Sequence, residues 1–202
     1  MFSPTAETHP KGSFYLTSYY IVLWQVGYAV TDSTQISITA MPPIAGEPVV
    51  PGDISIKTVL MRSPHVTVSA IGSASGIVGV EEFSGFLGRA GAVASLCVDA
   101  GECRISFHMA SDVALIGPAS LLFNGAGANF RVGRIVSILA EVDSLIPLGS
   151  QVGSANGVMG GAGVRLSGRA WGVDIGLFKA GKRGSDVSDL IPFLAATYRY
   201  VP

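Results

Sequence analysis

The chain has 202 residues, of which 49% are apolar and 13% are charged, and its formal net charge is −1. A soluble domain is about 25% charged on average, so this scarcity of charge argues against an ordinary soluble surface. No stretch approaches the ~18 consecutive apolar residues of a membrane helix, and an apolar chain of nearly neutral charge can bury its surface, so membrane helices and disorder are both excluded. The length fits a single domain over residues 1–202.

In chain order, apolar and polar side chains alternate with a period of two, which is the period of a β-strand. The range Arg104–Met109 is the clearest case, because every second residue in it is polar. The Gly- and Ala-rich segment 76–96 contains too many glycines for a helix, so the chain is expected to be all-β. The alternation predicts eleven strands, at about 13–30, 34–42, 53–62, 65–76, 86–98, 103–110, 117–129, 134–144, 157–167, 171–180 and 190–200.

The connections between these strands alternate in length. The tight ones lie at 31–34, 62–64, 99–101, 131–133 and 168–169. The longer ones, rich in Gly, Pro and Ser, lie at 43–52, 77–85, 111–116, 145–156 and 181–189. Short turns at one end and longer loops at the other are typical of outer-membrane barrels, whereas a soluble sandwich mixes its loop lengths. The sequence therefore predicts a closed, up-and-down, antiparallel transmembrane β-barrel.

The number of strands follows from a parity argument. A closed single-chain bacterial barrel has an even number of strands, with both termini on the short-turn side. Eleven candidates leave one strand missing, and the segment Phe2–Thr8 is left to supply it. We expect this segment to pair with the C-terminal strand and to close a barrel of about twelve strands. The alternative is a barrel of ten, with one candidate outside the wall.

Charged residues of the predicted strands are expected to face the lumen, because a charge that faces hydrocarbon at the midplane costs roughly 2–4 kcal/mol. Positive and negative charges are roughly matched among them. They predict either a network of ion pairs that fills a narrow lumen or a charged pore. The set is Lys57, Arg104, His108, Glu141, Asp143, Arg165, Asp174 and Arg199.

Aromatic residues cluster in the first and last predicted strands. Tyrosine and tryptophan favour the membrane–water boundary, so these residues are predicted to lie at the two interfaces of a membrane. The predicted interfacial set is Tyr19, Tyr20, Trp24, Tyr28, Trp171, Tyr198 and Tyr200.

Four segments spread over most of the chain carry a family resemblance: Phe2–Ala6, Val26–Asp32, Gly163–Leu177 and Pro192–Tyr200. They resemble segments of a set of largely uncharacterised, porin-like outer-membrane β-barrel proteins of Gram-negative bacteria. The resemblance implies a porin-like fold and a location in the bacterial outer membrane, and it implies no substrate and no catalytic residue. Because no basic and apolar leader follows Met1, we expect the signal peptide to have been removed.

Cys97 and Cys103 flank a short turn that contains Gly101. A three-residue loop with Gly101 in the left-handed conformation would set the two cysteines opposite each other. Exported proteins meet oxidising conditions, so a disulfide across this hairpin is one hypothesis and two unpaired cysteines are the other. Two cysteines without a nearby third ligand do not predict a metal site.

Some outer-membrane lipid hydrolases use Ser, His and an acid on a barrel, and the residue types of such a site are present here as Ser106, His108 and an acid at Glu141 or Asp143. Residues two apart on one strand are separated by roughly 7 Å, whereas a base must come within about 3 Å of its nucleophile. No catalytic residue and no enzyme is predicted. The Gly-rich segments 125–127 and 157–163 lack the Lys-Ser/Thr ending and the helix of a phosphate loop, so no cofactor site is predicted either.

Three functions remain in view from the sequence. The first is a small outer-membrane barrel that forms a pore or a structural element of the membrane, with outer-membrane lipid as its surroundings. The second is a barrel subunit whose loops or turns bind protein partners in an envelope complex. The third is a soluble, lipocalin-like ligand-binding barrel, in which the apolar face would point inward. The near-neutral net charge gives no sign of a nucleic-acid partner.

Overall fold

The computed structural model describes residues 5–20, 22–41, 50–78, 87–99, 103–116, 119–148, 157–182 and 190–202. Within these ranges no helix is long and apolar enough to cross a membrane. The strands are β1 (Phe14–Tyr19), β2 (Leu23–Ala29), β3 (Thr34–Ala40), β4 (Val50–Arg62), β5 (Val66–Val78), β6 (Leu87–Cys97), β7 (Ile105–Ile116), β8 (Ala119–Arg131), β9 (Val136–Leu148), β10 (Gly157–Ser167), β11 (Trp171–Lys182) and β12 (Leu190–Tyr200).

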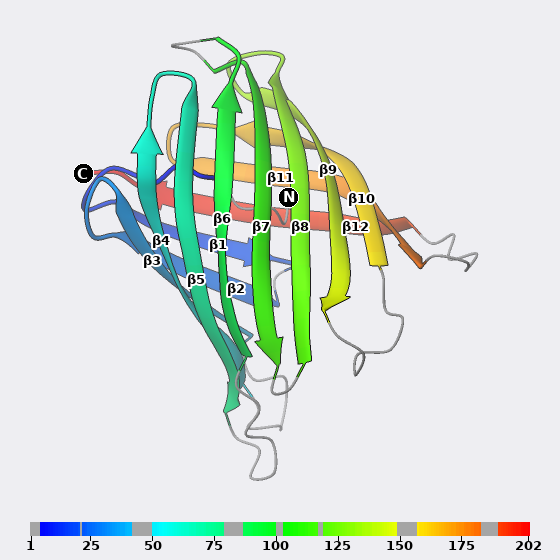
Figure 1. Ribbon diagram of the computed structural model, residues 1–202. Coiled ribbons are helices and arrows are strands. Elements are labelled where there is room, and N and C mark those ends of the chain that lie inside the picture. The colour runs from blue at the N-terminus through cyan, green and yellow to red at the C-terminus, as the bar shows by residue number, and fades with distance from the viewer. Residues whose placement is uncertain are drawn as a thin grey trace.

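The strands form one closed barrel in which each strand pairs antiparallel with its neighbours in the chain (Figure 1). The blue β1 closes the wall against the red β12, with Phe14 opposite Tyr200 and Tyr19 opposite Ala195 (Figure 1). Closure removes both sheet edges, so the main-chain groups of the wall are paired all the way around. The prediction of an all-β, up-and-down barrel of twelve strands is confirmed.

The strand predicted at 13–30 is in fact a hairpin of β1 and β2. The chain reverses after Tyr19, where Tyr20 takes a φ of 52° and the Val22 N–H donates to the Tyr19 carbonyl at 3.1 Å. No Gly or Pro marks this reversal, so the sequence pattern predicted one long strand instead of two. The length was the missed signal, because a membrane strand needs only about 9–11 residues.

The segment Phe2–Thr8 does not supply the twelfth strand, so the predicted closure by this segment is wrong. Residues 2–4 lie outside the described part of the chain. Residues 5–8 run inside the barrel, where Ala6 is fully buried and its N–H donates to the Ser95 hydroxyl at 2.8 Å. The even strand count comes from the division of 13–30 instead.

The apolar residues of the alternating strands face outward. Ile54 on β4 is 62% exposed and Met109 on β7 is 67% exposed, whereas the Ser69, Ser95 and Ser106 side chains on the inner face are buried. This orientation is the reverse of a lipocalin, whose apolar face lines the interior. The lipocalin-like alternative is therefore wrong for this barrel.

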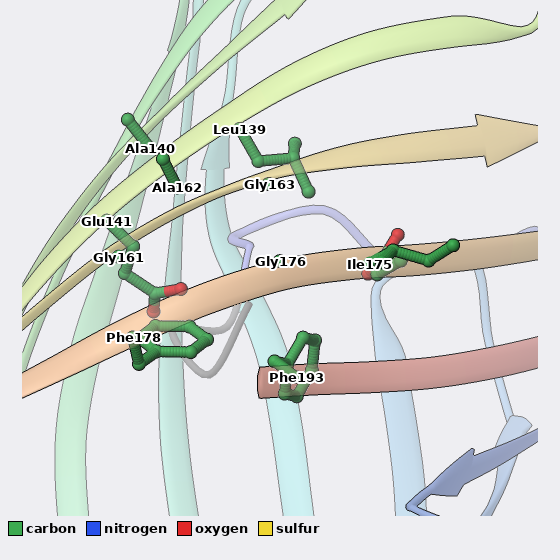
Figure 2. A pocket seen from close by; sticks show the side chains of 11 residues that line it. Leu139, Ala140, Glu141, Gly161, Ala162, Gly163, Ile175, Gly176, Phe178 and Phe193 are labelled. Atoms are coloured by element: carbon green, nitrogen blue, oxygen red, sulfur yellow. The ribbon is translucent and has the colours of Figure 1, made fainter. Parts of the chain in front are cut away.

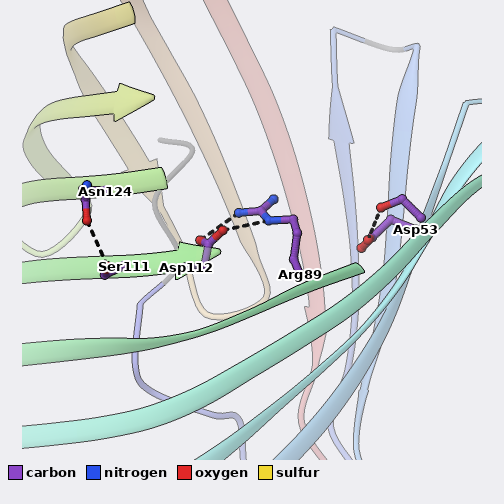
Figure 3. A network of polar contacts seen from close by, with 6 residues as sticks. Asp53, Arg89, Ser111, Asp112 and Asn124 are labelled. Atoms are coloured by element: carbon purple, nitrogen blue, oxygen red, sulfur yellow. Dashed lines mark hydrogen bonds and ion pairs between the residues drawn. The ribbon is translucent and has the colours of Figure 1, made fainter. Parts of the chain in front are cut away.

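One polar pair interrupts the apolar outer face. The Ser111 hydroxyl on β7 donates to the Asn124 side-chain oxygen on β8 at 2.9 Å, and the two residues are directly opposite in the register (Figure 3). The range 111–116 was predicted as a loop, because Ser111 and Asp112 break the alternation. Each of these residues is paired across the wall, and β7 continues through both to Ile116.

Glycines on the inner face make room for aromatic rings and close strand contacts. The Tyr15 ring lies over Gly27, where a Cβ atom would be 2.0 Å from the ring. Gly163 and Gly176 are opposite each other, and a Cβ on Gly176 would be 2.7 Å from the Ala162 carbonyl oxygen. These glycines serve packing inside the wall, as glycines do where another group approaches the backbone closely.

Candidate functional site: the barrel lumen

The largest cavity of the described structure lies inside the barrel, at the end that carries the tight turns. Its volume is about 700 Å³, and its walls come from β3, β4, β7–β12 and the N-terminal segment. Five of its lining side chains are cationic and two are acidic, so positive charge prevails here. The cationic ones are Lys57, Arg131, Arg134, Arg165 and Arg199, and the acidic ones are Glu7 and Asp174.

Arg165 and Asp174 form an ion pair in this cavity. Arg165 on β10 and Asp174 on β11 are opposite each other in the register. The Arg165 guanidinium donates two hydrogen bonds of 2.6 Å to the two carboxylate oxygens of Asp174. Such a bidentate pair fixes both side chains against the wall, because the planar fork of arginine matches the carboxylate. This contact is an ion pair of the kind that the sequence predicted for a filled lumen.

A second polar group lies toward the other end of the lumen (Figure 3). Arg89 on β6 donates two hydrogen bonds of 2.9 Å to the Asp112 carboxylate on β7 and stacks 5.0 Å from the centre of the Phe123 ring. Nearby on the wall, the Ser75 hydroxyl donates to the Asp53 carboxylate at 2.8 Å. This end therefore carries one ion pair and a second carboxylate that is bonded to a neutral hydroxyl.

The N-terminal segment crosses the lumen between these two regions. The Lys57 ammonium donates to the main-chain carbonyls of Thr5 at 3.0 Å and of Glu7 at 2.5 Å. The Ser69 hydroxyl donates to the Ala6 carbonyl. Lys57 was predicted to face the lumen, and it does so as a ligand of main-chain oxygens rather than as a free charge.

His108 lies at the centre of a buried hydroxyl network. Its Nδ1 atom is 2.7 Å from the Ser95 hydroxyl, and its Nε2 atom is 3.1 Å from the Ser106 hydroxyl. The argument that two residues on one strand lie too far apart for this contact is therefore wrong, because the imidazole leans along the strand toward Ser106. Both ring nitrogens are engaged by hydroxyls, and Ala6 covers Ser95, which favours a structural role.

The remaining predicted lumen residues occupy different depths. Glu141 is buried on β9, and Asp143 lies two residues further along the same inner face. The Arg199 guanidinium donates to the Arg169 carbonyl at 3.1 Å near the tight-turn end. Arg104 precedes β7, is exposed at the rim and is not among the side chains that line the cavity.

Glu141 borders a small pocket of about 20 Å³ in the inner wall. Gly161 and Gly163 leave the space, and the rings of Phe178 and Phe193 close it (Figure 2). The two rings meet edge to face with their centres 5.4 Å apart. This packing fills the space beside Gly161, where a Cβ atom would be 2.4 Å from the Phe178 ring.

The predicted interfacial aromatic residues divide into two groups. Trp24, Tyr28, Trp171, Tyr198 and Tyr200 are exposed on the outer face, and Tyr20 is exposed at the end of the β1–β2 hairpin. Tyr19 differs, because it points inward, donates to the Gln25 side chain at 3.3 Å and packs against Phe193. Tyr15, Thr17 and Tyr19 are alternate residues of β1, so their side chains point to the same, inner face.

Cys97 and Cys103 form a disulfide that joins β6 to the start of β7. The two residues are not directly opposite, because Cys97 is paired with Ser106 in the register and Cys103 takes a φ of 44°. Gly101 lies outside the described residues. In the same turn, the N–H groups of Arg104 and Ile105 hydrogen-bond the Asp99 carboxylate, and the first of these bonds is the main cause that lowers its pKa. No metal-binding cluster is found among the described residues.

Several lumen residues escaped the sequence prediction. Arg89 lies in a predicted strand of weak alternation and Asp112 in the predicted loop 111–116. Arg131 lies in the predicted turn 131–133, and Arg134 is the first residue of the strand predicted at 134–144. Glu7 was placed in a wall strand. The available signal was parity, because Arg89 keeps the phase of Ser95 along β6 and Asp112 keeps the phase of His108 along β7.

No known protein family and no curated protein matches the chain in sequence. Solved structures match its fold. It is similar to the KdgM porin, with a TM-score of 0.64 and 6% identity over 92% of this chain and 96% of that one. The chain has the fold of outer-membrane porins. It is also similar to the NanC porin, with a TM-score of 0.59 and 5% identity over 93% and 97% of the two chains. A third similar structure is LpxR from Salmonella typhimurium, with a TM-score of 0.53 and 9% identity over 93% and 99%.

Proposed function

We propose that the chain is a small outer-membrane pore that favours anionic solutes. The observation that carries the proposal is the cavity of about 700 Å³ inside the barrel, lined by five cationic and two acidic side chains. An excess of one sign of charge in a water-filled lumen raises the local concentration of solutes of the opposite sign. The outward apolar face supports a place in a lipid bilayer, and the porin fold supports the outer membrane.

The class of anion that suits this cavity is an acidic saccharide. The similar KdgM porin has been solved in complex with disordered oligogalacturonate. An acidic saccharide fits the same reasoning here, because arginine side chains bind carboxylates with paired, directed hydrogen bonds. Arg131, Arg134 and Arg199 stand near the tight-turn end, where a solute would leave or reach the cavity.

The test is the current through single barrels in a planar lipid bilayer with a salt gradient across it. A pore that favours anions gives a reversal potential of the sign set by chloride. A refolded barrel that inserts and carries no current would contradict the pore, and a reversal potential of the cation sign would contradict the charge argument. Removal of the signal peptide belongs to the same proposal and is checked by the N-terminal sequence of the protein from outer membranes.

The Ser95–His108–Ser106 network supports a structural role rather than hydrolysis. Ser95 and Ser106 are 2% and 4% exposed, and the Ser95 oxygen also accepts the Ala6 N–H. A nucleophile must reach its substrate, and Ser95 is covered by Ala6. Ser106 borders the cavity, but the acidic residues Glu141 and Asp143 do not line it with the Ser106–His108 pair. Binding of envelope proteins remains a separate proposal, which co-purification from membranes would test.

A further inference from the structure

Residues 5–9 lie in the lumen, where residues 5–7 are held through their main chain and Thr8 through its side-chain hydroxyl. The groups that hold residues 5–7 come from one side of the barrel: Lys57 on β4, Ser69 on β5 and Ser95 on β6. Main-chain hydrogen bonds do not depend on the side chains of the segment. The segment therefore lies against the inner face of the wall and is not one of the strands that form the barrel.

Ala6 completes this seat with an apolar contact. It packs with Val93 and Ala110 on the inner wall, and Ile71 adjoins the cluster. The contact is small, because one alanine side chain has a single methyl group, and burial contributes roughly 0.8 kcal/mol for each such carbon. The polar bonds therefore carry most of the hold on the segment.

The segment divides the lumen into two cavities. The larger cavity, of about 700 Å³, lies at the tight-turn end, and a second of about 330 Å³ lies beyond it. Thr5, Gln35 and Lys57 border both. A solute that moves from one of these cavities to the other passes the place where this segment and Lys57 meet.

Lys57 is the charged group among the three that hold residues 5–7, and it holds two carbonyls at once. A carbonyl is a neutral acceptor, whereas bonds between an ammonium and a carboxylate are stronger because both groups are charged. An anion that reaches the boundary between the cavities therefore competes with Thr5 and Glu7 for Lys57. Its binding would free the two carbonyls.

We propose that residues 5–9 are a displaceable strap that closes the lumen between its two cavities, and that Lys57 is the latch which an anionic solute releases. The proposal rests on the proposed pore function for its meaning in transport. The position of the strap and its release are physical properties that are measured without transport.

The first measurement follows the strap directly. The two cysteines of the chain are joined in a disulfide, so an introduced cysteine is the single free thiol. Ala6→Cys places that thiol at a fully buried position of the strap. Labelling by a water-soluble maleimide is expected to be slow in this variant and at least about tenfold faster when Lys57→Met is added, since hydrogen bonds to a charged group are lost.

The matched control is Lys179→Met, which makes the same change on the outer face of β11, away from the strap. Labelling of Ala6→Cys is expected to stay slow in this background. Citrate serves as the anionic probe and is compared with chloride at the same ionic strength. Citrate is expected to speed labelling when Lys57 is present and to have no effect with Lys57→Met. Only barrels that keep heat-modifiable migration in gels are compared, so that misfolded protein does not contribute.

The second measurement is single-channel conductance. Lys57→Met is expected to raise it and Lys179→Met to leave it unchanged. Equal labelling with and without Lys57→Met would overturn the latch. Faster labelling with unchanged conductance in conducting barrels would overturn the closure of the lumen. Faster labelling in barrels that never conduct would establish a displaceable strap and contradict the pore function instead.

Discussion

Gly176 on β11 offers a sharp test of the inner wall, because its environment is backbone rather than flexible side chain. A Cβ atom at this position would lie 2.7 Å from the Ala162 carbonyl oxygen and 3.1 Å from the Gly163 Cα atom. Gly172 lies on the same strand and the same face, and its nearest neighbour would be the Leu166 carbonyl oxygen at 3.9 Å. Gly176→Ala and Gly172→Ala therefore make the same chemical change with and without a clash.

The magnitude follows from two opposing effects. Overpacking of a well-packed site costs about 1–3 kcal/mol. Replacement of Gly by Ala also stabilises by about 0.4–1 kcal/mol through the unfolded chain. Gly172→Ala should receive the second effect alone and unfold at an equal or higher urea concentration. Gly176→Ala should be about 1–2 kcal/mol less stable than the unchanged protein, after the gain is subtracted.

The assay is reversible urea unfolding in lipid vesicles, followed by tryptophan fluorescence and extrapolated linearly to zero denaturant. The difference between the two variants isolates the clash, because the effect on the unfolded chain is common to both. Equal stability of the two variants would refute the close approach of β10 and β11 at Gly163 and Gly176.

Three further predictions concern the lumen, the hairpin and the outer face. Arg165→Met leaves the Asp174 carboxylate without its cation, so urea unfolding should show a loss of about 1.5–3 kcal/mol. The reversal potential should also move toward the cation sign, and an unchanged reversal potential would show that this pair does not face the conducting path. Reduction of the disulfide should destabilise the barrel by about 2 kcal/mol, measured as a lower urea midpoint with reductant than without. Joint replacement of Ser111 by Ala and Asn124 by Leu should leave stability in vesicles unchanged or raised, because both hydrogen-bonding partners are removed from an apolar face, whereas a clear loss would place that face against something polar.

The alternation of apolar and polar residues was enough to predict most of the strands and the face to which their side chains point. Ile54 and Ile56 face outward and Ser55 faces inward, because a strand exposes successive side chains to opposite sides and lipid selects the apolar ones. The strands at 157–167 and 190–200 were placed with the bounds that the structure gives to β10 and β12. Where both the period and the bounding turns were clear, local pattern and barrel agreed.

The sequence predictions failed where the local structure depends on contacts with residues that are remote in sequence. The reversal at Tyr20 depends on the register of β1 against β12, which no Gly or Pro announces. The path of Thr5 and Ala6 through the lumen depends on Lys57, Ser69 and Ser95, which are remote in sequence. Asp112 looked like a loop residue because its partner, Arg89, is visible only after β6 and β7 are paired.

The central claim is that the outer face of this barrel lies in lipid and that its inner face lies around water. Spin labels at the neighbouring positions 109 and 110 of β7 test it most directly, because Met109 points outward with 67% exposure and Ala110 points inward with 8%. In lipid vesicles, a label at 109 should collide with dissolved oxygen and be shielded from a water-soluble nickel complex, and a label at 110 should not show this lipid signature. Free access of the nickel complex to the label at 109 would contradict a barrel that spans the bilayer.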